Sequence, residues 1–387
     1  CNSLVMGASI LISQSVGAKK REDIGEYAGA MLKYNNIIPI FLCFFWMIFP
    51  KPVFMILGVS DNVMPLCLGY VRWYAPLFLL TGLGGSLGVI LQTSNYTKPL
   101  VVYGCVRSGF NIFLDWMLIF GNLGMPALGI EGAAIATVIA EYVGAIYISV
   151  IFFTSKRLPT RPSWNDVKKG HFQSYLNAAK LGINIALEDF AWNIGNLILI
   201  RILNSINEYA AGIYTIIFGV EVLAVVIIGA IGSGTMTLTS EATGRKDLAQ
   251  YKGITLCAYA VCTIVTVVMI VGAVLFPEQI LSLFTSDKTV IASCGGYLLL
   301  IGINLFSKSG NIIIGNAIRG SGNTKWMLFT QIFGTIWIVS VASVLVFICK
   351  LGIFGVVLAV ILDEGVRALI NLGKYLRIVK KWGEWNG

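Results

Sequence analysis

The chain has 387 residues, of which 57% are hydrophobic and only 12% are charged. A soluble domain carries about 25% charged residues, so this composition excludes an ordinary soluble protein and indicates a membrane protein. The formal net charge is +9, but the basic residues are interleaved with long apolar runs and form no single patch, which argues against nucleic-acid binding.

Apolar runs of about twenty residues or more recur along the chain, the length that a helix needs to cross roughly 30 Å of hydrocarbon. They are too long and too continuous for the strands of a membrane barrel, so we predict an all-α integral membrane protein. In chain order, the expected spans cover residues 34–57, 66–92, 99–121, 128–154, 178–203, 210–240, 254–276, 293–318, 326–349 and 352–373. Pro39 and Pro76 lie inside two of these spans and should kink them.

The sequence contains the same pattern twice. GVILQTSNYTKP at residues 88–99 matches GNAIRGSGNTKW at 315–326, an offset of 315 − 88 = 227. LGIEGAAIATVIAE at 128–141 matches LGIFGVVLAVILDE at 351–364, an offset of 351 − 128 = 223. A duplication in so apolar a chain is typical of a transporter built from two homologous bundles, with the substrate path between them. We expect two six-helix bundles related by a parallel pseudo-twofold repeat.

The two repeats differ at their beginnings. Residues 239–247 match residues 12–20, but in the second repeat they follow a whole span, 178–203, that has no counterpart in the first. The expectation is therefore a chain that lacks the first helix and part of the second helix of its first bundle.

The basic residues predict the orientation. Lys and Arg gather in alternate loops, and the positive-inside rule places these loops and the C-terminus in the cytoplasm. We therefore expect a multi-pass protein of the inner (plasma) membrane. The predicted domains are an incomplete N-lobe bundle over residues 1–154, a cytoplasmic linker over 155–177, and a C-lobe bundle with a cytoplasmic tail over 178–387.

Several classes of chemistry have no matching residues. His171 is the only histidine, and the eight cysteines form no C-x-x-C pattern, so the chain can supply neither a histidine-rich metal site nor a Ser-His-Asp triad. It also has no G-x-x-x-x-G-K-[ST] phosphate loop. We expect no enzyme activity, no catalytic residue and no cofactor.

Ionisable residues inside the spans are the candidate functional residues, because a carboxylate near the bilayer centre costs several kcal/mol. Asp115 lies in FNIFLDWMLIF, and Asn111 precedes it by one helical turn on the same face. The pair can contribute to a Na⁺ site, or the amide can steady a carboxyl group that takes up a proton. The alternative is an aspartate that is capped or paired with a neighbouring helix.

Further acidic residues lie within the second repeat. Glu188 and Glu221 lie near the middle of their spans, where each could face a polar cavity or pair with Arg201. Glu141 and Glu364 occupy matching places in the two repeats, at an offset of 364 − 141 = 223. Retention by both halves favours a structural role for these two residues, in tying helices together.

The chain resembles the multidrug and toxic compound extrusion (MATE) family of cation-coupled antiporters. The segments that carry the resemblance are LQTSNYTKP with its echo IRGSGNTK, NIFLD, GIEGAAIAT and LGINIALED, and they extend over nearly the whole chain. The resemblance implies twelve helices in two six-helix lobes, with a pseudo-twofold axis along the membrane normal and a central cavity. It also implies export of cationic and amphipathic compounds while Na⁺ or H⁺ enters.

The resemblance assigns roles by position. Asn111 and Asp115 match the polar pair of the family's N-lobe cation site, and Thr137 matches a threonine that lines the same pocket. A further acid of that site belongs to the family's first helix, for which this sequence has no counterpart. The second repeat has no acid at the place of NIFLD, which favours the N-lobe as the coupling side; Glu188 or Glu221 is the C-lobe alternative. Asp115 is expected to be buried in the outer half of the N-lobe, close to Asn111 and within reach of Thr137.

The leading hypothesis is a secondary antiporter that exports organic cations or amphipathic drugs in exchange for Na⁺ or H⁺. Its expected partners are small organic or cationic substrates and the lipid bilayer, and we expect a monomer that binds no nucleic acid. The alternatives are a lipid-linked saccharide flippase of the same superfamily and a non-transporting membrane scaffold. A flippase should have a strongly basic cavity for a pyrophosphate headgroup, whereas the predicted spans contain few cations.

Overall fold

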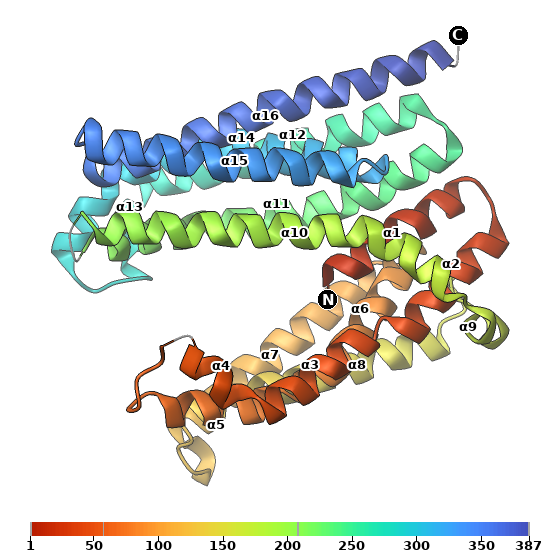
Figure 1. Ribbon diagram of the computed structural model, residues 1–387, viewed down its shortest axis with the longest axis horizontal. Helices are drawn as coiled ribbons and strands as arrows, with labels where there is room; N and C mark the ends of the chain where they lie inside the picture. The colour runs from red at the N-terminus through yellow and green to blue at the C-terminus, as the bar shows by residue number, and fades with distance from the viewer. Residues whose placement is uncertain (1, 57, 207–208, 386–387) are drawn as a thin grey trace. The chain divides into compact units, whose positions relative to one another are not determined.

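The computed structural model describes residues 2–56, 58–206 and 209–385, and these ranges are almost entirely helical, with no strand (Figure 1). The prediction of an all-α protein is therefore confirmed. The chain divides into two compact units, Cys1–Gly182 and Ile183–Gly387, whose boundary falls inside α10 (Phe172–Asn204).

The first unit contains a series of helices that precede α10. They are α1 (Asn2–Gly17), α2 (Arg21–Tyr34), α3 (Ile37–Ile48), α4 (Pro50–Ile56), α5 (Met64–Tyr74), α6 (Leu77–Thr93), α7 (Lys98–Phe120), the 3-10 turn η1 (Asn122–Gly124), α8 (Ile130–Thr154) and α9 (Trp164–Lys169). Its core includes Ile12, Met31, Ile90 and Ile148, from α1, α2, α6 and α8. These buried side chains hold the helices together in the part of the unit that contains α9 and the start of α10.

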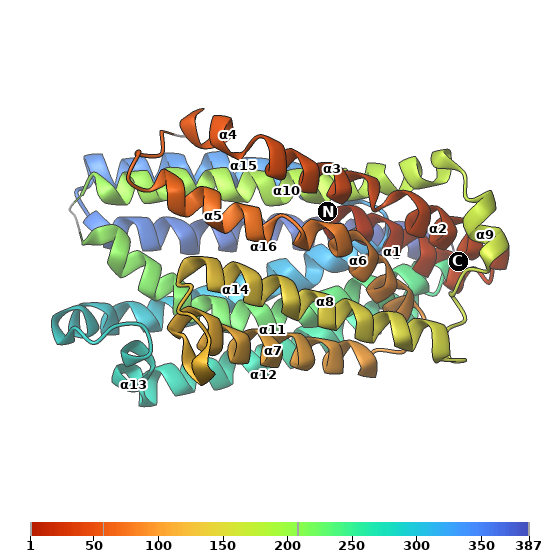
Figure 2. The same cartoon turned by 90° about the horizontal axis from the view of Figure 1, so that it is seen from below.

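The second unit contains most of α10 and the helices that follow it. They are α11 (Ala210–Arg245), α12 (Leu248–Leu275), α13 (Pro277–Ser282), α14 (Lys288–Gly320), α15 (Thr324–Ser343), the π-helical turn η2 (Val344–Ile348) and α16 (Gly352–Trp385). Helix α14 packs against α11, α12 and α16, and Figures 1 and 2 show these long helices running alongside one another. Ile228, Leu298 and Ile313 belong to the core between α11, α12 and α14.

Six helices of the described residues are long and apolar enough to cross a membrane, or up to seven if the bent pair α5 and α6 is one span. The spans expected over 99–121, 178–203 and 352–373 coincide with α7, α10 and α16. These three helices carry several ionisable residues and are not among the six. The more polar helices are where sites for ions or polar ligands are expected in a membrane protein.

The span expected over 34–57 was placed too far along the chain. The candidate span covers Arg21–Ile48, and residues 50–56 form the separate helix α4. A proline lacks the N–H that would continue a preceding helix, so Pro50 begins a new one. The kink expected at Pro76 is confirmed, because this residue caps α6 at a bend of 45° between α5 and α6.

Candidate functional site

In the first unit, close packing of α7 and α8 positions the polar side chains of Asn111, Asp115 and Thr137. Gly132 of α8 makes the approach possible, since a Cβ there would lie 2.6 Å from the backbone oxygen of Leu118 in α7. Gly132 belongs to the segment GIEGAAIAT, in which Ala134 and Ala136 are also buried. The small residues of this segment therefore place the polar side chains of α7 next to α8.

Two of the three residues that were assigned to the N-lobe site contact each other. The Asn111 amide donates to the Thr137 hydroxyl at 3.4 Å, and that hydroxyl donates to the backbone oxygen of Ala133 at 2.9 Å. Asp115 lies one turn further along α7. It is partly rather than fully buried, which corrects the expectation, but its Oδ1 atom is buried and has no hydrogen-bond partner among the described residues.

Glu141 lies one helical turn after Thr137 on α8, and its carboxylate contacts two residues of α7. Its carboxylate pairs with Arg107 at 3.1 Å and accepts a hydrogen bond from the Tyr103 hydroxyl at 2.9 Å. Gly144 makes room for Tyr103, because a Cβ at this position would lie 2.7 Å from the tyrosine ring. Glu141 thus ties α8 to α7, whereas Asp115 has no ion-pair partner in the part of the chain that the structure describes.

The second unit holds a buried cluster of five charged residues from α11, α14 and α16. Lys308 is central, with its Nζ 3.0 Å from Glu221 and 3.7 Å from Glu364. Arg367 contacts Asp363 at 2.7 Å and Glu364 at 3.1 Å. All five residues are between 3% and 8% exposed. Charges so deeply buried must be paired, because the cost of removing each one from water is several kcal/mol.

Amide side chains complete this C-lobe charge cluster. Asn304 donates to Glu221 at 2.7 Å, Asn311 donates to Glu364 at 2.9 Å, and Arg367 donates to the Gln331 oxygen at 2.8 Å. Asn371 donates in turn to the Asn311 oxygen at 2.6 Å. A cavity of about 40 Å³ opens beside the charged side chains, lined in part by aromatic residues. The cluster is a connected polar network that joins four helices through their buried faces.

The cluster has one acid more than it has bases. Glu221, Asp363 and Glu364 supply three carboxyl groups, and Lys308 and Arg367 supply two cations, so its net charge is 2 − 3 = −1 when every group is ionised. The Oδ1 atom of Asp363 is buried and has no hydrogen-bond partner in the described ranges. The excess charge can be neutralised by one proton or one small cation.

Glu188 of α10 pairs with Arg319, near the end of α14, through two contacts, one of them Nε to Oε2 at 3.3 Å. The pairing with Arg201 that the sequence suggested for Glu188 and Glu221 is therefore wrong, since Arg319 and Lys308 take that place. The roles of Lys308, Asp363 and Arg367 were missed. A cation inside each of two apolar spans and the i, i+4 spacing of Asp363 and Arg367 were the available signals.

No cluster of three or more His, Cys, Asp or Glu side chains suited to a metal ion is found in the ranges that the structure describes. Among the described residues, two carboxyl groups have a buried oxygen without a hydrogen-bond partner. One is Asp115, which lies one helical turn from Asn111, and one is Asp363, whose second oxygen pairs with Arg367.

Comparisons with known proteins define the class. A sequence profile described as MatE matches residues 1–117 and 184–345. The chain is 27% identical over 397 residues to a probable multidrug resistance protein NorM of Thermotoga maritima, and the alignment covers 98% of this chain and 80% of that protein. It is 24% identical over 373 residues to the uncharacterized transporter YisQ of Bacillus subtilis, which covers 95% of this chain and 80% of the relative.

Solved structures have the same fold. A crystal structure of MATE in the straight conformation superposes with a TM-score of 0.91 at 19% identity, over 99% of this chain and 85% of the other. An outward-facing conformation of a multidrug resistance MATE family transporter of the MOP superfamily superposes with a TM-score of 0.89, with the same identity and coverage.

The apolar helices and these matches define a multi-pass membrane transporter rather than an enzyme. The chain belongs to the MatE family, the multidrug and toxic compound extrusion transporters. The resemblance that its motifs indicated is thereby confirmed.

Proposed function

We propose that the protein is a secondary antiporter that exports small organic cations or amphipathic compounds in exchange for Na⁺ or H⁺, with Asp115 as the coupling residue. In this proposal the protein works as a monomer with a cytoplasmic C-terminus. The name of the Thermotoga maritima relative, a probable multidrug resistance protein, supports an organic substrate. The gathering of Lys and Arg in alternate loops supports the orientation.

The observation that carries the proposal is the buried Oδ1 atom of Asp115, which has no hydrogen-bond partner among the described residues. Glu188 has Arg319 and Glu221 has Lys308, so these C-lobe carboxylates are already neutralised by fixed cations. Asn111 lies one helical turn before Asp115, and its neutral amide contacts the Thr137 hydroxyl. A carboxyl group in this setting is stabilised by taking up a proton or a small cation, which is the exchange that a coupling site must perform.

Coupling requires that the ion favours one conformation over another. A cation that enters down the membrane potential gains about 2.3 kcal/mol per charge per 100 mV. This energy drives export only where ion binding at Asp115 lowers the affinity for the substrate, because a ligand shifts an equilibrium only by its differential affinity for the two states.

The test is substrate efflux by cells or vesicles that contain the Asp115→Asn variant, with Na⁺ and pH gradients varied independently. The change is nearly isosteric and removes a charge from membrane depth, so the variant should insert and fold normally. Efflux should be lost or should no longer respond to the ion gradient. Asp61→Asn, at an exposed position, makes the same chemical change and should leave efflux unaltered.

An unchanged ion dependence in Asp115→Asn would overturn the N-lobe assignment. The C-lobe charge cluster would then be the candidate coupling site, and Asp363, whose Oδ1 atom has no hydrogen-bond partner in the described ranges, would be substituted first, before Glu188 and Glu221. The flippase alternative is tested separately, by assaying the translocation of a lipid-linked saccharide.

A further inference from the structure

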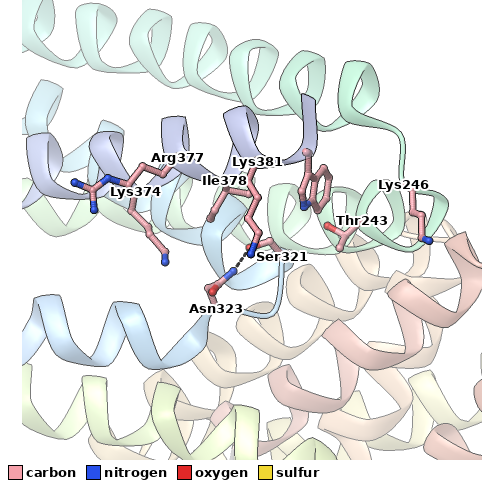
Figure 3. Close-up of a pocket in the computed structure, with 9 residues that line it drawn as sticks. Thr243, Lys246, Ser321, Asn323, Lys374, Arg377, Ile378 and Lys381 are labelled. Carbon is pink, nitrogen blue, oxygen red and sulfur yellow. Dashed lines mark hydrogen bonds between the residues drawn. The ribbon is translucent and has the colours of Figure 1, made fainter. Parts of the chain in front are cut away.

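A second, strongly basic pocket lies in the second unit, away from the C-lobe charge cluster. It forms where the end of α11, the turn between α14 and α15, and the last part of α16 meet, and its volume is about 440 Å³ (Figure 3). We call it the basic pocket. Its lining residues are Thr243, Lys246, Ser321, Asn323, Lys374, Arg377, Ile378, Lys381 and Trp382.

Four of these lining residues are cations, and none of the nine is acidic. Lys374, Arg377 and Lys381 recur at i, i+3 and i+7 and so lie along one face of α16, and Lys246 comes from the end of α11. Within the described ranges, none of the four has an ion-pair partner. Neighbouring cations outside the pocket do have one: Arg245 pairs with Glu241.

Like charges on one helix face repel one another, so a gathering of this kind is stabilised when an anion lies between them. The polar groups of the lining suit an oxyanion. Thr243 and Ser321 supply hydroxyl groups, and Asn323 supplies an amide that also donates to Ser321 at 2.8 Å. Three lysines and an arginine with neutral donors match a phosphate group, which accepts several hydrogen bonds.

The pocket also has an apolar side, formed by Ile378 and Trp382, and aromatic contacts hold its surroundings in place. Trp382 packs against the buried Tyr251, with ring centroids 5.1 Å apart, and Tyr251 donates to the backbone oxygen of Ala317 at 2.9 Å. Lys374 lies 4.9 Å from the centroid of the Trp326 ring. Tryptophan is enriched at the headgroup level of membranes, and basic pockets between membrane helices bind anionic headgroups.

We propose that the basic pocket binds a phosphate-bearing anion. Two sources have this chemistry, the headgroup of an anionic phospholipid and a free phosphate. The site is separate from the proposed coupling residue Asp115, and it stands whether or not the proposed antiport is correct.

The test compares two double variants of the full chain in neutral detergent. Lys374→Gln with Lys381→Gln removes two cations of the pocket, and Lys252→Gln with Lys380→Gln removes two exposed cations that do not line it. Both changes lower the net charge equally. Binding of phosphatidylglycerol, phosphatidylcholine and inorganic phosphate is measured by native mass spectrometry and by the shift in unfolding temperature.

The unsubstituted protein and the control variant should retain phosphatidylglycerol in preference to phosphatidylcholine. The pocket variant should bind phosphatidylglycerol at least about tenfold more weakly than the control variant does. Competition by millimolar inorganic phosphate would assign the site to free phosphate, and its absence would assign the site to a lipid headgroup. Equal binding of phosphatidylglycerol by the two double variants would overturn the proposal.

A third variant tests the proposal even if the pocket double variant fails to fold. Lys246 has a φ of +57°, and asparagine tolerates this left-handed conformation, so Lys246→Asn removes one pocket charge from a different helix at little conformational cost. It should weaken phosphatidylglycerol binding several-fold. Unchanged binding in Lys246→Asn together with a misfolded double variant would also contradict the proposal.

Discussion

Arg367 of α16 lies directly across Gly334 of α15, so closely that a Cβ at position 334 would lie 2.4 Å from Cδ of the arginine. The first repeat has the reverse arrangement. Arg107 is the counterpart of Gly334, since 334 − 107 = 227, and Gly144 is the counterpart of Arg367, since 367 − 144 = 223. The arginine and the glycine have thus exchanged helices between the repeats.

What both repeats retain is an arginine paired with the matching glutamate. Arg107 contacts Glu141 at 3.1 Å, and Arg367 contacts Glu364 at 3.1 Å. The arginine reaches the glutamate from the neighbouring helix in the first case and from the same helix in the second. The exchange of the glycine with the arginine keeps the two helices close in both repeats. This supports the structural role expected for Glu141 and Glu364.

Gly334→Ala should destabilise the protein by about 1–3 kcal/mol, because overpacking a filled contact forces neighbouring groups to move. Arg367 cannot move freely, since its guanidinium is held by Asp363 and by the Gln331 oxygen. The measurement is denaturant or thermal unfolding in detergent. Gly109→Ala is the matched control on α7, where a Cβ would meet no atom within 4 Å. Equal unfolding midpoints for the two variants would contradict the close packing.

Removing Lys308 should be far more damaging than removing one of its acidic partners. Lys308→Met leaves Glu221 without its cation and leaves Glu364 and Asp363 to share Arg367, and unpairing a buried charge costs about 3–5 kcal/mol. Glu221→Gln leaves Lys308 paired with Glu364, so its effect should be smaller.

The double variant Lys308→Met with Glu221→Met separates pairing from packing. Replacing both partners of a buried ion pair with apolar groups of similar size is often neutral, so this variant should recover much of the stability lost in Lys308→Met. Unfolding of all three variants under the same conditions measures the coupling. If the double variant were no more stable than Lys308→Met, the pair would not account for the loss.

The helices and the family could be predicted because their signals are local. The apolar runs gave the extent of α8, α11, α12 and α14, and Pro76 gave the position of a bend. The end of the span predicted over residues 34–57 was wrong because apolar residues continue past Pro50, while the helix does not.

The charge pairs could not be predicted because they join distant segments. Glu188 and Arg319 are 131 positions apart and share no local pattern. Asp363 and Arg367 do have an i, i+4 spacing, but spacing alone does not show that Glu364 and Gln331 also hold the arginine. Asn111 and Thr137 were brought together in advance only through the family resemblance, and the structure places them in contact.

The stability of the N-terminal cap of α14, formed by Asp287, should depend on pH. The pKa of Asp287 is lowered because the Thr289 hydroxyl and backbone N–H donate to its carboxylate, at 2.5 and 2.8 Å. The folded protein therefore prefers the ionised acid. The stabilisation is present above the ordinary pKa of an aspartate and is lost as the pH falls through the lowered pKa of the folded state.

Hydrogen exchange in the first turn of α14, corrected for intrinsic rates, measures this effect. Protection should fall on acidification in the unsubstituted protein, and the fall should begin at higher pH in Thr289→Ala, which removes the hydroxyl donor. Asp287→Asn keeps a capping oxygen but does not titrate, so its protection should not depend on this acid. The same pH dependence in Asp287→Asn would assign the effect to another group.

At the proposed coupling site, Thr137→Ala should weaken ion coupling without abolishing transport. The hydroxyl is one neutral group, and its loss leaves the Asn111 amide without the acceptor that it has at 3.4 Å. A neutral hydrogen bond is worth about 1 kcal/mol, so the concentration of coupling ion needed for half-maximal efflux should rise about fivefold. Thr137→Ser retains the hydroxyl and should behave almost as the unsubstituted protein.

Asp115→Asn should lose the ion dependence altogether, because it removes the charge that binds the ion. Efflux rates at graded Na⁺ and H⁺ concentrations distinguish the three variants. Should Thr137→Ala and Thr137→Ser give the same ion dependence, the hydroxyl would have no part in the site, and the role of Asn111 would have to be assigned without it.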